Sequence, residues 1–165
     1  MLKLVTIIGA RPQIIKAAAL SRAIRNNYSK AINEIIVHTG QHYDNNMSGS
    51  FFEQLEIPEP HVNLECSGGT QAEQTAAIMV HYEKLLLEKP SNLCLVVGDV
   101  NSSMACAITA QKLCIPVAHV EAGIRSGDWS MPEEINRLVT DAITNYFFTT
   151  SEVANQTLRA SGYGD

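Results

Sequence analysis

The feature that most constrains the fold of this chain is a series of short, almost unbroken apolar runs, several of which end in a glycine. Runs of this kind are typical of parallel strands that are buried on both faces of a sheet. The sequence therefore predicts strands at KLVTIIG (3–9), EIIVHTG (34–40), NLCLVVGD (92–99), IPVAHVEAG (115–123) and YFFTTS (146–151), with a short apolar piece at 62–64.

Segments with helical periodicity lie between the runs. Pro12 stands where the first turn of a helix tolerates proline, and a helix follows it. Thr70 with Glu73 forms a capping-box pattern, which predicts the start of another helix that ends before Pro90. Further helices are predicted at 44–55, 101–113, 133–145 and 152–160. The apolar residues at helical spacing are Ala17, Leu20 and Ile24, then Ile78, Tyr82 and Leu85, and then Ile135, Leu138, Val139 and Ala142, the last four facing inward.

Alternation of strands and helices implies right-handed crossovers and a doubly wound parallel sheet, that is, an α/β fold. The length of 165 residues fits one domain, and 45% hydrophobic with 18% charged residues is typical of a globular protein. A net charge of −5 argues against broad nucleic-acid binding.

The sequence gives no sign of export or membrane insertion. No apolar run approaches the length of a membrane span. The N-terminal residues MLKLVTIIGARP carry no signal-peptide cleavage site. The four cysteines form no CxxC pair, and three lie in apolar surroundings, as reduced core cysteines do. We therefore expect a cytoplasmic protein.

Ligands of an open parallel sheet bind beyond the carboxyl ends of its strands. At this edge the predicted strands place a guanidinium, an imidazole, two carboxylates and several glycines. These residues are 11–12, 40–42, 98–99, 121–123 and 150–151.

The basic and polar members of this set allow two interpretations. GARP lacks the GxGxxG spacing of a dinucleotide site. Arg11 and Lys16 could bind a phosphate together with the amides at the helix start, or form a plain surface pair. Gln41 and His42 are either turn residues or part of a site. His119, inside an apolar strand, is expected to be a hydrogen-bonded core histidine.

The acidic residues carry the stronger functional signal. Asp99 could cap the following helix, contact a ligand, or both. Glu121 emerges from a buried strand before a glycine, so we expect it to be partly desolvated and suited to proton transfer.

Glu133 and Glu134 lie in the first turn of a helix, where the dipole favours acids. Glu133, Arg137 and Asp141 could also form an i, i+4 ladder. Alternatively, Glu133 pairs with Glu121 as an acid and a base. Metal binding is not expected, since HxxxH, CxxC and Asp-rich loop patterns are lacking.

The blocks GARPQIIK, TGQHYDNNM, GDVNSSMACAITAQKLCIPVAHVEAGIRSGD and MPEEINRLVTD together resemble the signature blocks of the UDP-N-acetylglucosamine 2-epimerase family. The resemblance covers nearly all of the chain. It implies a glycosyltransferase-B architecture, in which two Rossmann-like domains close on a nucleotide sugar. Residues 1–165 correspond to the N-terminal domain, and the C-terminal nucleotide-binding domain is expected to be absent from this chain.

The resemblance implies a non-hydrolysing isomerase of polysaccharide biosynthesis that interconverts UDP-GlcNAc and UDP-ManNAc. The family's reaction is anti elimination of UDP to a 2-acetamidoglucal, followed by re-addition of UDP, and it needs neither a metal nor a nicotinamide cofactor. The full-length protein is expected to be a homodimer. Because the family's C-terminal domain supplies most nucleotide contacts, we expect the isolated chain to have little or no turnover.

The resemblance also implies roles for individual residues. Asp99, Glu121 and Glu133 match the family's catalytic acids, and Arg11 and Lys16 match basic residues near the diphosphate. Other residues at or near the substrate are Arg125, Glu134 and Asn136, which with Arg137 also shape the loop. Gln41 and His42 match a region that binds a second UDP-GlcNAc in some bacterial members, but QHYDNN departs from their QHRxML form.

Two other functions are compatible with the same fold. One is the acceptor-side domain of a glycosyltransferase of the same architecture, and the other is a non-catalytic module that retains the fold. The blocks HVEAG and MPEEINR favour the epimerase.

Overall fold

The computed structural model describes residues 1–40 and 49–164. The strands are β1 (Leu2–Ile8), β2 (Ile32–His38), β3 (Val62–Asn63), β4 (Leu93–Val97), β5 (Val117–Val120) and β6 (Tyr146–Phe148). The helices are α1 (Arg11–Ala23), continued by the π-helical turn η1 (Ile24–Tyr28), α2 (Gly49–Gln54), α3 (Gln71–Glu88), α4 (Asn101–Lys112), α5 (Pro132–Ala142) and α6 (Glu152–Ala160).

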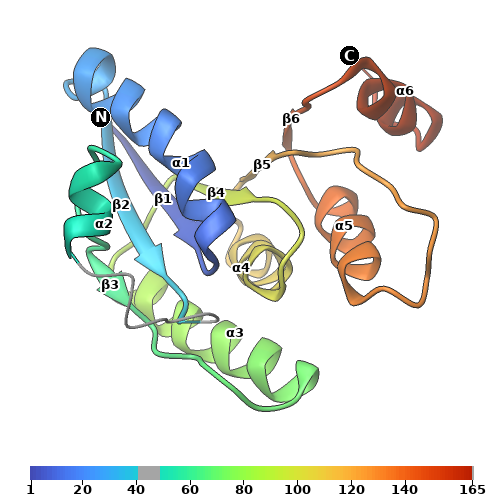
Figure 1. Ribbon diagram of the computed structural model, residues 1–165, viewed down its shortest axis with the longest axis horizontal. Helices are drawn as coiled ribbons and strands as arrows, with labels where there is room; N and C mark the ends of the chain where they lie inside the picture. The colour runs from blue at the N-terminus through green and yellow to red at the C-terminus, as the bar shows by residue number, and fades with distance from the viewer. Residues whose placement is uncertain (41–48, 165) are drawn as a thin grey trace.

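The described strands form one six-stranded sheet in the order β3-β2-β1-β4-β5-β6 (Figure 1). Every neighbouring pair in this sheet is parallel. The chain adds strands outward in one direction from β1 to β3 and then returns to add β4 to β6 on the other side. This order confirms the predicted doubly wound, Rossmann-like sheet, and it places the topological switch point between β1 and β4.

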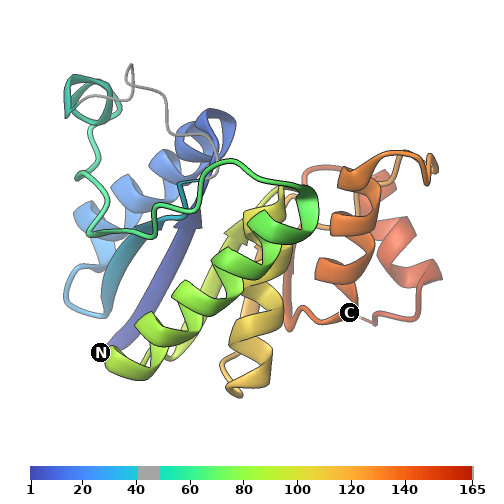
Figure 2. The same cartoon turned by 90° about the horizontal axis from the view of Figure 1, so that it is seen from below.

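Helices cover both faces of the sheet. Helices α1 and α2 lie on one face and α3 and α4 on the other, as Figure 2 shows. The strand residues alternate accordingly, because successive side chains of a strand point to opposite faces. Val5 and Ile7 pack in the core under α3 and α4, whereas Leu4 and Ile8 pack under α1. The central strand β1 is therefore buried on both sides, whereas the edge strand β6 is not, since Tyr146 and Phe148 are exposed.

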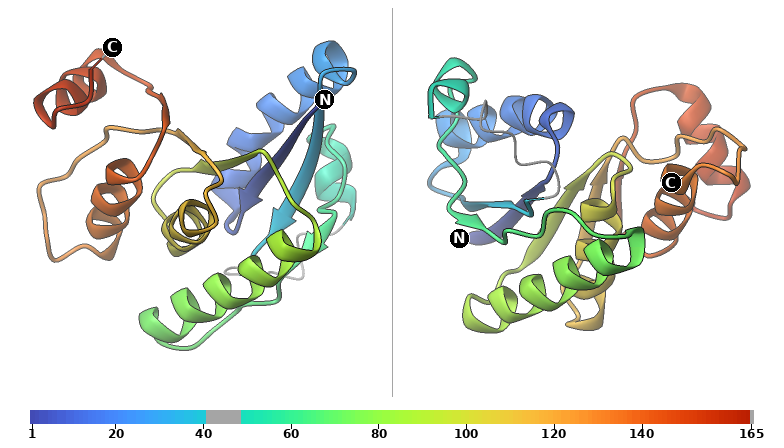
Figure 3. Two further views of the ribbon diagram at one scale, coloured as in Figure 1. Left: turned by 180° about the vertical axis from the view of Figure 1, so that it is seen from behind. Right: turned by 60° about the horizontal axis from the view of Figure 1, so that its bottom comes forward.

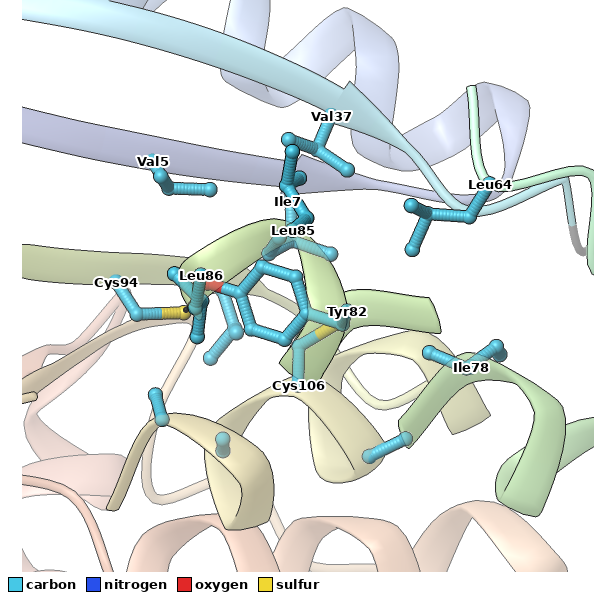
Figure 4. Close-up of a cluster of buried hydrophobic side chains, with 14 of the residues drawn as sticks. Val5, Ile7, Val37, Leu64, Ile78, Tyr82, Leu85, Leu86, Cys94 and Cys106 are labelled. Carbon is cyan, nitrogen blue, oxygen red and sulfur yellow. Dashed lines mark hydrogen bonds between the residues drawn. The ribbon is translucent and has the colours of Figure 1, made fainter. Parts of the chain in front are cut away.

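The core under α3 and α4 is built around Tyr82 (Figure 4). Its ring is fully buried, and its hydroxyl donates a hydrogen bond to Sγ of Cys94 at 3.2 Å. The predicted capping box at the start of α3 is confirmed, since the Glu73 amide donates to Oγ1 of Thr70 and the Thr70 amide donates to Glu73. The cysteine prediction also agrees, because the buried thiols are those of Cys66, Cys94 and Cys106.

Two predicted helices differ from the structure in detail. The helix expected at 44–55 is described only from Gly49 to Gln54, and residues 41–48 lie outside the described range. In α1, Ala17 is buried as its spacing suggests, but Leu20 is 36% exposed. The buried face of α1 includes the polar Gln13 and Ser21 instead.

The predicted inward face of α5 is wrong. Ile135 is 37% exposed, Ala142 is exposed, and Leu138 and Val139 are only half-buried. The buried residues of this helix are polar: Glu134, Asn136, Thr140 and Asp141. The reason is that this polar face of α5 packs against the loops at the carboxyl edge of the sheet, which carry charged residues.

Helices α5 and α6 lie with β6 at the end of the sheet opposite β3 (Figures 1 and 3). None of the described helices has the length and apolar character needed to span a membrane.

Candidate active site at the carboxyl edge of the sheet

Three loops approach one another closely where β1 ends. A Cβ placed on Gly9 would lie 2.3 Å from Oγ of Ser102 and 2.6 Å from Oγ1 of Thr39, so this position accommodates only glycine. These hydroxyls also contact each other at 2.7 Å. The turn after β1 is thus locked against the end of β2 and the start of α4.

Gln13 fixes the turn between β1 and α1. Its Oε1 accepts hydrogen bonds from the amides of Gly9 at 2.7 Å and Ala10 at 3.0 Å. Its Nε2 donates to the carbonyl of Val97 at 2.5 Å and to Ser103 at 3.1 Å. The side chain of Gln13 therefore occupies the amides of Gly9 and Ala10, which one interpretation of the sequence offers as phosphate donors.

Lys16 and Glu121 form an ion pair across the switch point. The ammonium nitrogen lies 2.7 Å from Oε2 of Glu121, and the two side chains are 44% and 20% exposed. The backbone of Glu121 has a φ of 71°, a conformation that costs a non-glycine residue energy. Backbone strain of this kind is found where a structure holds a side chain in a required position. The expectation that Glu121 is partly desolvated agrees with its burial.

Asp99 is held by α5. Arg137 donates to its Oδ2 from Nε at 3.0 Å and from Nη2 at 2.5 Å. The N-cap of α4 is Val100, which makes no side-chain capping hydrogen bond. Of the two interpretations of Asp99, the structure therefore does not show the helix cap. Its carboxylate remains 32% exposed at the edge of the sheet.

Glu134 organises the loop before α5. Its side chain accepts hydrogen bonds from the amides of Ser126 and Gly127 and from Arg137. Burial alone would raise the pKa of Glu134, but these donors lower it to about 2. Arg137 therefore joins Glu134 to Asp99, and the expected ladder of Glu133, Arg137 and Asp141 is not what Arg137 forms.

Glu133 lies apart from Glu134, on the exposed side of the first turn of α5. It lines a polar pocket of about 320 Å³ where the starts of α3, α4 and α5 meet, a proximity visible in Figure 2. The side-chain Nδ2 of Asn101 donates to Oε1 of Gln71 at 2.6 Å and to Oε1 of Gln74 at 2.9 Å, and all three residues line this pocket. Asn136 joins it to the neighbouring loop by donating to the carbonyl of Asp99 at 2.8 Å.

A buried cluster of hydrogen-bonded side chains around Asp141 holds the loops of this edge together. Asp141 accepts hydrogen bonds from Nδ1 of His119 at 2.7 Å, from the amide of Gly123 at 3.0 Å and from Arg125 at 2.6 Å. His119 is 1% exposed and also contacts the carbonyl of Gly98. The expectation of a hydrogen-bonded core histidine agrees with this environment.

The structure thus brings most of the predicted site residues to one edge. Asp99 lies with Asn136 and Arg137, Glu121 lies with Lys16, and Glu133 lines the adjacent pocket. Arg11 is exposed at the start of α1, and Arg125 and Glu134 hold the loop that precedes α5. Gln41 and His42 lie outside the described residues. A larger hollow of about 470 Å³ beside β6 and α6 is lined by none of the predicted site residues.

Sequence reasoning missed the polar residues that hold these loops, chiefly Gln13, Thr39, Ser102 and Ser103. One available signal was the position of Gln13 at the third residue of a helix, where Glu or Gln closes a capping box. Among the residues that the structure describes, no three His, Cys, Asp or Glu side chains are grouped as a metal site.

The sheet order defines a Rossmann-like α/β domain with a candidate site at its switch point. Residues 24–165 match the family profile described as UDP-N-acetylglucosamine 2-epimerase. The chain belongs to the UDP-N-acetylglucosamine 2-epimerase family.

Similar proteins support this assignment. The chain is 47% identical over 162 residues to UDP-2,3-diacetamido-2,3-dideoxy-D-glucuronate 2-epimerase of Pseudomonas aeruginosa, covering 98% of this chain and 45% of that protein. It is 49% identical over 161 residues to a UDP-N-acetylglucosamine 2-epimerase homolog of Methanococcus maripaludis, covering 98% and 44%.

A solved structure is similarly close. The UDP-GlcNAc 2-epimerase of Methanocaldococcus jannaschii, in complex with UDP-GlcNAc and UDP, superposes with a TM-score of 0.93 and 45% identity. The superposition covers 99% of this chain and 44% of that one. The chain therefore spans about half the length of the relatives it matches.

Proposed function

We propose that this chain is the N-terminal domain of a non-hydrolysing UDP-GlcNAc 2-epimerase, which interconverts UDP-GlcNAc and UDP-ManNAc. The observation that carries the proposal is the arrangement of Asp99, Glu121 and Glu133 at the carboxyl edge of the sheet, beside Lys16. Family membership favours this activity over that of an acceptor-side glycosyltransferase domain or a non-catalytic module.

The reaction requires proton transfer on both faces of the sugar ring. A base removes the proton from carbon 2, the electron pair forms the carbon 1–carbon 2 double bond, and UDP leaves carbon 1. An acid then protonates carbon 2 on the other face, and UDP adds back to carbon 1. Two separately held carboxyl groups suit this chemistry better than one shared pair. Glu121, above Gly98, and Glu133, in its own pocket, are held by different elements.

Lys16 links substrate binding to this chemistry in the proposal. Its ammonium pairs with Glu121, and a diphosphate would compete for the same cation. When the diphosphate takes the cation, the carboxylate of Glu121 loses its partner and becomes a better base. Arg11, exposed on the same turn of α1, supplies a second cation near the diphosphate.

Asp99 is the third acid of the proposed site. Its Arg137 pair fixes it with part of the carboxylate exposed, so it can accept a hydrogen bond from a sugar hydroxyl. Asn136 and the amides of Gln71 and Gln74 give the adjacent pocket the donors and acceptors that a sugar needs. Arg125 and Glu134 act by holding the loop.

Residues of this chain form only part of the proposed site, since the relatives are about twice as long. We therefore propose that the chain alone binds UDP-GlcNAc weakly and turns it over little or not at all. A cytoplasmic location and a homodimeric full-length protein also remain proposals.

The test is incubation with UDP-GlcNAc in deuterated water, followed by NMR of the sugar. Unchanged protium at carbon 2 is expected, and deuterium at carbon 2 or release of UDP would contradict the proposed inactivity. Titration of the labelled chain with UDP-GlcNAc should shift the amide signals of Gly98, Asp99 and Glu121. A response confined to residues of the hollow beside β6 would overturn the proposed site.

One second substrate has a specific observation behind it. A relative with 47% identity is named for UDP-2,3-diacetamido-2,3-dideoxy-D-glucuronate. Titration with that sugar nucleotide, beside UDP-GlcNAc, decides between them. A larger shift at the same amides, at equal concentration, would assign the diacetamido sugar as the substrate.

A further inference from the structure

The imidazole of His119 lies between two hydrogen-bond acceptors. Its Nδ1 is 2.7 Å from Oδ1 of Asp141, and its Nε2 is 2.9 Å from the carbonyl oxygen of Gly98. His119 and Asp141 are each 1% exposed. The ring is therefore satisfied by these protein oxygens rather than by bulk solvent.

A neutral imidazole carries one N–H, so only one of its nitrogens can donate a hydrogen bond. With a single proton, the other nitrogen would present its lone pair to an oxygen at hydrogen-bond distance. This contact is repulsive and leaves buried polar atoms unsatisfied. Turning the ring by half a turn would place carbon atoms against both oxygens. The imidazolium, which donates from both nitrogens, is the form that fits.

We propose that His119 is held as a buried imidazolium and that, with Asp141, it is a positioning pair for the proposed reaction. One nitrogen binds the carbonyl of Gly98, which directly precedes Asp99. Through Asp141, the other is joined to the amide of Gly123, two residues after Glu121. The pair therefore ties the loop that carries Asp99 to the loop that carries Glu121.

The charged groups around His119 agree with this protonation. Asp141 approaches it from α5, and Arg125 reaches the other oxygen of the same carboxylate from the loop after β5. Burial alone would raise the pKa of Asp141, but the hydrogen bond and charge of His119, with Arg125 and the Gly123 amide, lower it. Arg125 alone would neutralise the charge of Asp141. The second cation, the imidazolium of His119, is stabilised in addition by its hydrogen bond to the carbonyl of Gly98.

This cluster is distinct from the pair that fixes the carboxylate of Asp99. Arg137, which also lies on α5, binds Asp99 and Glu134 instead. Helix α5 thus sets the backbone of the Asp99 loop through His119 and the side chain of Asp99 through Arg137. The positioning role rests on the proposed function, whereas the protonation state of His119 does not.

The protonation state is tested by long-range ¹H–¹⁵N correlation spectra of the unaltered chain with ¹⁵N-labelled histidines. These spectra distinguish the imidazolium from either neutral tautomer, and through-bond assignment from the backbone identifies His119. The imidazolium pattern is expected for His119, since both ring nitrogens face oxygen acceptors. A neutral pattern for His119 overturns the proposal.

The positioning role is tested with Asp141→Asn, which keeps the size of the side chain but removes its charge. His119 is expected to become neutral, and the amide signals of both Asp99 and Gly123 are expected to shift. Asp141→Glu, which keeps the charge, serves if the first variant fails to fold, and it should retain the imidazolium. Glu152→Gln, at an exposed pair on α6, is the matched control and should leave these signals in place.

Shifts confined to α5 and Gly123, with Asp99 unmoved, would overturn the positioning role. None of these spectra requires a sugar nucleotide. Failure of the chain to bind UDP-GlcNAc would therefore count against the proposed function and leave the protonation of His119 intact.

Discussion

The ammonium of Lys16 lies 2.7 Å from Oε2 of Glu121, although the two residues are 105 positions apart in the sequence. The same carboxylate oxygen lies 3.3 Å from where a Cβ on Gly98 would stand. The loops that follow β4 and β5 therefore meet helix α1 at one carboxylate. The topological switch point of the sheet is therefore also the place where Lys16 and Glu121 pair.

Gly98→Ala should displace the carboxylate of Glu121. Gly98 has a φ of +68°, so an alanine there also costs about 1–2 kcal/mol of folding stability through backbone strain. Gly68→Ala is the matched control, because Gly68 has a φ of +75° with nothing within 4 Å of the added Cβ. Both variants should lose similar stability in denaturant unfolding, but only Gly98→Ala should shift the side-chain carboxyl signal of Glu121. Equal shifts in both variants would contradict the contact.

Glu134→Gln should destabilise the chain in a pH-dependent way. Removing one partner of this buried, hydrogen-bonded pair is expected to cost about 3 kcal/mol near pH 7. The pKa of Glu134 is about 2 in the folded chain instead of 4.5. A lowered pKa stabilises the folded state above the unfolded value, and this contribution is lost as the pH falls through the folded value.

The difference between the original chain and Glu134→Gln should therefore shrink as the pH falls from about 4.5 to about 2. Denaturant unfolding at several pH values measures it. Glu152→Gln, whose side chain is largely exposed, should show a small and nearly constant difference. A Glu134→Gln penalty that stays constant down to the lowest pH would contradict the assigned hydrogen bonds.

The sheet could be predicted because its signal is local. Each buried strand is a contiguous apolar run, and the alternation of Val5 and Ile7 with Leu4 and Ile8 follows from the pleat alone. The capping box of Thr70 and Glu73 is also local, three residues apart. Such features need no knowledge of distant partners.

The polar face of α5 could not be predicted for the opposite reason. Apolar spacing identifies the buried face of a helix only when its neighbours are apolar. Here the partners of Asp141 and Arg137 are His119 and Asp99, 22 and 38 residues away in the sequence. The positions of Glu121 and Asp99 at the strand ends were predictable from topology, but their cations were not. Lys16 was expected either at a phosphate or in a surface pair, and the structure pairs it with Glu121.

Thiol modification should separate the cysteines by burial. Burial raises the pKa of Cys94 to about 12 and raises that of Cys106 well above its ordinary value, while Cys114 is exposed. Because the thiolate is the reactive form, only Cys114 should be alkylated rapidly in the folded chain near pH 8. Mass spectrometry of the digested chain gives the sites. Rapid modification of Cys94 without denaturant would contradict the packing around Tyr82.

Thr140→Val should stabilise the chain. Thr140 is fully buried in α5, and its Oγ1 has no hydrogen-bond partner among the described residues. Valine has nearly the same shape and removes the unsatisfied hydroxyl, whose burial costs about 1–3 kcal/mol. Valine also keeps the β-branch, so the helix propensity changes little. A gain of about 1 kcal/mol in denaturant unfolding is expected.

Thr109→Val is the matched control for this substitution. Thr109 is 2% exposed in α4, and its Oγ1 donates to the carbonyl of Ala105 at 2.8 Å. The same chemical change there removes a formed hydrogen bond and should destabilise the chain by about 0.5–1.5 kcal/mol. The two variants should therefore move the unfolding midpoint in opposite directions. A loss of stability in Thr140→Val as large as in Thr109→Val would show that the Thr140 hydroxyl has a partner in solution.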